Sequence, residues 1–136
     1  MKFTLVTFLS FFTLSTTAQL SNKFEDSLTS KSSQNWLLDS IGVRDGYNTH
    51  FHFVKGTKLQ FTVAENSVVI KAPSKVAKKS RWGIKVSRYA TLEVDGMNRF
   101  EIDFFTRRGT YYMRLRDEIG AQKNIFVTEY YFVKSN

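Results

Sequence analysis

The sequence predicts one all-β domain, an antiparallel barrel with a β-sandwich as the alternative. A chain of 136 residues has the length of a single ordinary domain. From Asn35 onward, apolar and polar residues alternate with a period of two, which is the pattern of half-buried strands. Turn residues separate these segments at short intervals, a rhythm typical of antiparallel barrels and sandwiches rather than of βαβ units. We expect about nine short strands, whose order the pattern does not give.

The first 18 residues have the pattern of a signal peptide. Lys2 precedes an uncharged apolar run from Phe3 to Leu14, and small residues follow at positions 16–18. The run is shorter than the roughly 20 residues that span a bilayer as a helix. We therefore expect cleavage after Ala18, and a secreted or periplasmic protein that is not stably inserted in a membrane.

Residues 19–33 form a polar, serine-rich leader. It is either flexible or a short helix, in which Phe24 and Leu28, four residues apart, would share one face. The single all-β domain then covers residues 34–136. The chain has no cysteine, which excludes a disulfide scaffold, a thiolate metal site and a cysteine nucleophile.

The expected strands follow from alternation bounded by turns. Asp45-Gly46, Lys55-Gly56 and Asp95-Gly96 are turn signals, Pro73 ends a strand, and the basic segment 73–80 is the best loop candidate. We expect the strands near residues 36–42, 47–54, 59–63, 67–72, 82–86, 90–94, 100–105, 111–116 and 125–133. The apolar rows predict a core that contains Trp36, Phe61, Trp82, Ile84, Leu92, Phe100, Ile102, Met113 and Leu115.

Positive charge is concentrated in the middle of the chain, whose formal net charge is +8. Between Lys71 and Arg116 there are twelve basic residues and four acids, and the stretch from Lys75 to Arg88 contains no acid. Such a surface attracts polyanions, and interleaved aromatic residues such as Tyr89 and Tyr112 could stack on bases or sugars. The alternative is a solvated basic face without a partner. The candidate polyanion-binding residues are Lys75, Lys78, Lys79, Arg81, Lys85, Arg88, Arg114 and Arg116.

The sequence contains little that suggests catalysis. It lacks a G-x-S-x-G elbow, a phosphate-binding loop and an H-E-x-x-H motif. His50 and His52 would share one face of a strand and could bind a metal ion together, although two exposed histidines are the simpler reading. Glu101 and Asp103 also share a face, where a surface charge ladder is the simpler reading than a catalytic pair. We expect no enzyme and no cofactor.

One family resemblance rests on Trp36, on the run of short amphipathic strands that follows it, and on the aromatic last strand. In these respects, residues 35–134 resemble the small exported lipocalin-like proteins of bacteria. The resemblance implies an up-and-down barrel with Trp36 at its closed base, and Arg116 or Lys134 packed across that ring. The family often has glycine two residues before the tryptophan, where this chain has Gln34.

Two hypotheses of function remain open. The resemblance implies non-catalytic binding of a small apolar or amphipathic molecule inside the barrel. The alternative is a surface that binds polyanions, such as acidic polysaccharide, lipopolysaccharide or nucleic acid. Aromatic residues could line a cavity or fill a closed core. The candidate ligand-binding residues are Trp36, Phe51, Phe53, Phe61 and Trp82.

Overall fold

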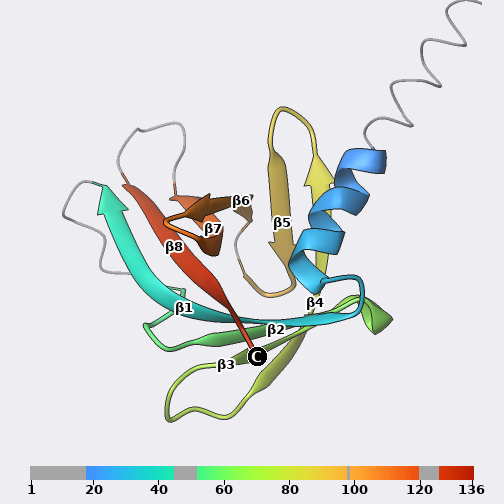
Figure 1. The fold of residues 1–136 in the computed structure, drawn as a ribbon. Coiled ribbons are helices and arrows are strands. Elements are labelled where there is room, and N and C mark those ends of the chain that lie inside the picture. Colours follow the sequence, from blue (N-terminus) through green and yellow to red (C-terminus); the bar gives the residue numbers. More distant parts are fainter. Residues whose placement is uncertain (1–17, 45–51, 98, 120–125) are drawn as a thin grey trace, which may run out of the picture.

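The computed structural model describes residues 18–44, 52–97, 99–119 and 126–136. Within them, eight strands form a closed antiparallel barrel in which each strand pairs with the next and β8 pairs with β1 (Figure 1). This confirms the predicted all-β barrel. The strands are β1 (Ser33–Arg44), β2 (Lys58–Thr62), β3 (Ser67–Lys71), β4 (Lys78–Val86), β5 (Ala90–Val94), β6 (Phe100–Arg107), β7 (Thr110–Ile119) and β8 (Phe126–Ser135).

The strand expected at residues 47–54 is the main difference between the prediction and the structure. Residues 47–51 lie outside the described part of the chain, and residues 52–54 belong to no strand. Two features form a turn there: the Thr57 hydroxyl donates to the Val54 carbonyl (2.6 Å), and Gly56 has a φ of 85°. This local hydrogen bond competes with strand pairing. The described residues therefore form eight strands.

Two other strands extend into segments that were expected to be loops. β4 begins at Lys78, because the backbone of Lys78 and Lys79 pairs with Ile70 and Val69 of β3. β7 continues to Ile119 alongside β8. Pairing with a neighbouring strand thus overrides the local composition in both places.

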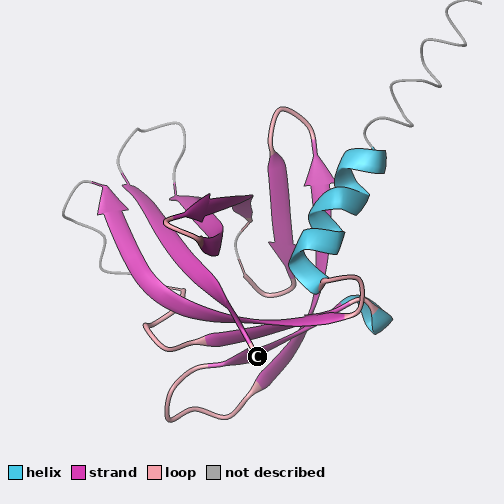
Figure 2. Ribbon diagram, viewed as in Figure 1, coloured by secondary structure: helices cyan, strands magenta, loops and turns pink. Residues whose placement is uncertain are grey.

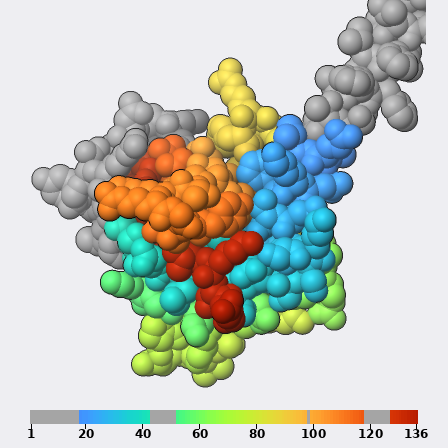
Figure 3. All heavy atoms as spheres, in the orientation of Figure 1, coloured from blue at the N-terminus to red at the C-terminus, as the bar shows by residue number. Residues whose placement is uncertain are grey.

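A helix over residues 18–29 precedes the barrel (Figure 2). Of the two alternatives for the leader, the structure contains the helical one. Leu28 is fully buried, and the Phe24 ring lies 6.0 Å from the Phe104 ring of β6. In Figure 3 the helix (blue) lies beside the orange β6–β7 region and the red C-terminus. No helix within the described ranges is long and apolar enough to cross a membrane.

The inward-facing side chains of the described strands form one hydrophobic core. Eight of the nine predicted core residues are buried, and the ninth, Ile84, is partly buried and packs against them. Burying such side chains supplies most of the favourable free energy of folding. The alternation of the sequence therefore identified the inner face of the barrel correctly.

Candidate functional site

The residues predicted to line a ligand cavity are part of the packed core. Trp36, Phe61 and Trp82 are buried on inward strand faces, and Phe51 lies outside the described residues. Phe53 enters the interior from the β1–β2 connection. Its ring centroid lies 5.6 Å from that of Phe100, 5.1 Å from that of Tyr130 and 5.6 Å from that of Phe132. The side chain of Phe53 thus packs among the inward-facing rings of β6 and β8.

Trp36 lies at the end of the barrel that the helix covers. Its indole Nε1 donates to the Leu28 carbonyl (2.8 Å), which satisfies a buried donor and fixes the helix against the barrel. The Lys134 ammonium lies 6.0 Å from the centre of the Trp36 ring and 5.2 Å from that of Tyr111. Of the two basic residues considered for this position, Lys134 occupies it, and Arg116 lies on the outer wall.

His52 belongs to a polar cluster at the opposite end of the barrel. Its Nε2 lies 2.6 Å from Oδ2 of Asp117, which is 2% exposed, and its backbone N–H donates to the Tyr130 hydroxyl (2.8 Å). Burial raises the pKa of Tyr130, so the phenol stays protonated and neutral. The other candidate metal ligand, His50, lies outside the described residues. Among the residues that the structure describes, no three His, Cys, Asp or Glu side chains form a group that could hold a metal ion.

Exposed cations gather on the outer wall formed by β2, β3 and β4. Lys58 of β2 and Lys71 of β3 are direct register partners, and both are exposed. Like charges at such positions repel, because side chains directly opposite are only about 5 Å apart at Cβ. The outward positions of β4 add three more cations. We call this set the basic face, which comprises Lys58, Lys71, Lys79, Arg81 and Lys85.

Only two cations of the basic face have carboxylate partners within the described residues. Lys79 Nζ lies 2.7 Å from Glu65 Oε2, and Lys85 Nζ lies 3.2 Å from Glu93 Oε1. The hydrogen bond from Lys79 lowers the pKa of the Glu65 carboxyl, which therefore stays ionised. Both pairs are solvent-exposed, where such contacts contribute little to stability. The remaining cations leave the basic face with a net positive charge.

The eight predicted polyanion-binding residues fall into two groups. Six of them lie on β4 and in the turns beside it, whereas Arg114 and Arg116 lie on β7, three strands away around the barrel. Lys78 lies on the same, inward face of β4 as Trp82, but it is exposed because it is at the end of the strand. Sequence reasoning did not include Lys58, because its proximity to Lys71 becomes visible only once the register of β2 and β3 is known.

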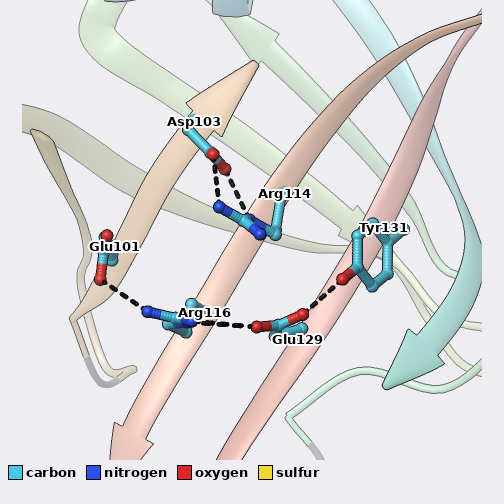
Figure 4. Close-up of polar contacts among 6 residues, drawn as sticks. All are labelled: Glu101, Asp103, Arg114, Arg116, Glu129 and Tyr131. Atoms are coloured by element: carbon cyan, nitrogen blue, oxygen red, sulfur yellow. Dashed lines mark hydrogen bonds and ion pairs between the residues drawn. The ribbon is translucent and has the colours of Figure 1, made fainter. Parts of the chain in front are cut away.

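Arg114 and Arg116 belong to a network of ion pairs on the outer wall of β6, β7 and β8 (Figure 4). Arg114 donates to both oxygens of Asp103, at 2.9 and 2.6 Å. Arg116 lies between Glu101 and Glu129, with N–O distances of 3.6 and 3.2 Å. Carboxylates thus offset the charge of both arginines. The same contacts occupy Glu101 and Asp103, the pair considered for catalysis.

Glu129 and Tyr131 complete this network. Burial raises the pKa of Glu129, but hydrogen bonds from Tyr131 and Arg116 and the positive charge of Arg116 lower it, and the net shift is downward. The pKa of Tyr131 is raised by burial and by its hydrogen bond to this carboxylate. Glu129 therefore remains an anion and Tyr131 a hydrogen-bond donor at neutral pH.

Comparison with known proteins supplies no relative: no family model, curated sequence or solved structure matches this chain.

Proposed function

We propose that this protein is a non-catalytic binding protein that recognises polyanionic chains through the basic face. The observation that carries the proposal is the direct pairing of Lys58 with Lys71 beside the cations of β4. Repulsion among these cations opposes folding slightly. A row of anions bound over them would remove that repulsion and add attraction. Sulfated or carboxylated polysaccharide, lipopolysaccharide and nucleic acid share this chemistry. The signal-peptide pattern of residues 1–18 supports a site of action outside the cytoplasm.

The test is binding to heparin as a function of salt concentration. The wild-type protein should bind at low salt and release steeply as salt rises, because each neutralised anionic group releases condensed counterions. The double variant Lys58→Gln/Lys71→Gln should bind more weakly, and the slope of log K against log[salt] should fall by about two. Lys23→Gln/Lys31→Gln is a matched control, which removes the same charge from exposed positions outside the basic face. Equal loss in both variants, or binding insensitive to salt, would refute the proposal.

A second candidate function, binding of a small apolar molecule, places the ligand where Phe53 lies. Phe53 comes from the β1–β2 connection rather than from a strand, so its ring can leave the interior without breaking strand pairing. A titration with decanoate, followed by the fluorescence of Trp36 and Trp82, tests this. Phe53→Ala should bind decanoate more tightly than the wild type, because the substitution vacates apolar volume. No binding by either protein would eliminate this candidate.

A further inference from the structure

A groove of about 500 Å³ lies on the outer wall near the β6–β7 turn, away from the basic face. This volume lies within the range of small-molecule sites in proteins. Three aromatic residues, Phe105, Tyr112 and Tyr131, line the groove together with the charged residues Asp39, Arg107 and Arg108. Half-buried rings therefore lie beside exposed charged side chains in this groove.

The aromatic rings of the groove are held in fixed positions. Phe105 and Tyr112 are register partners whose rings stack at 5.4 Å, and Tyr131 meets Phe105 edge-on at 6.2 Å. The Arg114 guanidinium lies 5.9 Å from the centre of the Phe105 ring. As Figure 4 shows, Arg114 is itself held by Asp103, and the Tyr131 hydroxyl by Glu129. The ion-pair network therefore holds the rings in place before any ligand binds.

Two backbone irregularities bring charged side chains to the groove. The β1–β8 pairing shifts register between Leu38 and Ser40, which leaves Asp39 in a bulge at the groove. Bulges commonly redirect a side chain toward a binding site. The two-residue turn between β6 and β7 has positive φ at both positions, 51° at Arg108 and 79° at Gly109. Asparagine or glycine suits the first of these positions, and arginine adopts it at a cost in stability.

Arg108 thus occupies a position that backbone preference alone would assign to asparagine. Residues held in unfavourable backbone conformations cluster at functional sites. Arg107 and Arg108 place two guanidinium groups at one end of a set of aromatic rings, and guanidinium groups bind carboxylates in bidentate fashion. The C–H face of a sugar ring packs against the electron-rich face of an aromatic ring. Asp39 can accept hydrogen bonds from sugar hydroxyl groups.

We propose that this groove binds a uronic acid unit of an acidic glycan. The sugar ring stacks on Tyr112 beside the nearly perpendicular ring of Tyr131, its carboxylate pairs with Arg107 and Arg108, and its hydroxyls donate to Asp39. A nucleic-acid strand fits the groove less well, because Asp39 and the neutralised wall of β6–β8 offer no continuous row of cations for successive phosphates. The inference is independent of the basic face, since the two sites lie on different walls of the barrel.

The test is isothermal titration with trigalacturonic acid, with neutral galactotriose as the comparison. The wild type should bind the acidic trisaccharide at least tenfold more tightly than the neutral one. Tyr112→Leu should weaken binding of the acid at least tenfold. Arg108→Asn should also weaken it about tenfold, and should raise the melting temperature because asparagine suits the turn. The latter variant therefore separates loss of binding from loss of folding.

Lys23→Gln/Lys31→Gln, which removes two exposed charges outside both sites, should bind trigalacturonic acid as the wild type does, so a loss in Arg108→Asn reports the groove and not a lower net charge. No binding of the acid by the wild type would overturn the proposal. The same conclusion follows if Arg108→Asn retains full affinity, or if galactotriose binds equally well. Competition by an oligothymidylate of equal charge would assign the groove to a nucleobase instead, and would also overturn the proposal.

Discussion

Replacing Lys58 with glutamate should stabilise the barrel while weakening its binding to polyanions. In the wild type, Lys58 and Lys71 are directly opposite across β2 and β3. The substitution turns a repulsive cross-strand pair into an attractive one. Such pairs contribute roughly 0.2–1 kcal/mol each, so the free energy of unfolding should rise by about 0.5–1 kcal/mol at low salt. Because the screening length falls to about 3 Å at 1 M salt, most of this gain should disappear there.

Urea unfolding at low and high salt measures the effect, and a double-mutant cycle isolates it. Lys58→Glu in a Lys71→Gln background should give much less stabilisation, because the partner charge is gone. Heparin affinity should fall in parallel with the gain in stability. A Lys58→Glu variant that is less stable than the wild type at low salt would refute the reasoning. A gain that persists unchanged in the Lys71→Gln background would refute it as well.

Three further predictions concern the core, the ion-pair network and the N-terminus. Trp82 is 6% exposed, and its Nε1 donates to the Ser67 carbonyl at 3.0 Å. Trp82→Ala should therefore lower the free energy of unfolding, measured with urea, by about 3–5 kcal/mol. A decrease below about 1 kcal/mol would contradict this packing. The pKa of Glu129 is lowered in the folded protein. Its contribution to stability is therefore present above the unfolded-state pKa near 4.5 and is lost as pH falls through the lower folded value. Between pH 6 and pH 3, the free energy of unfolding should accordingly depend less on pH in Glu129→Gln than in the wild type. An identical dependence in both proteins would contradict a lowered pKa of Glu129. The protein recovered from its native host should begin at Gln19, and an intact mass that retains residues 1–18 would disprove cleavage.

Which residues of each strand face the core was predictable from sequence, because each strand has one solvent-exposed face and one buried face. Phe100 and Ile102 of β6 are two positions apart, as are Met113 and Leu115 of β7, and all four are buried. The same rule failed near Phe53, which alternates with His52 as strand residues do. A loop that places one apolar side chain in the core produces the same short alternation. Only the presence or absence of backbone pairing distinguishes such a loop from a strand.

The candidate sites required information that a linear pattern does not contain. Alternation places Arg114 and Arg116 on the outside, but their carboxylate partners come from other strands. Asp103 of β6 pairs with Arg114, and Glu129 of β8 pairs with Arg116. The Lys58–Lys71 pair depends on a register that is set by the turn and by the buried face together. Asp39 reaches the groove through a bulge, and an extra residue in a strand leaves no composition signal.

Closure of the barrel joins the two ends of the domain, because Asn35 pairs with Ser135 and Trp36 with Lys134. The residues of β8 therefore close the barrel, and a chain that lacks them leaves the edges of β1 and β7 without their neighbour. Topologies with such distant contacts fold slowly, commonly over milliseconds to seconds. Open strand edges also promote aggregation, which makes chains truncated before β8 candidates for misassembly.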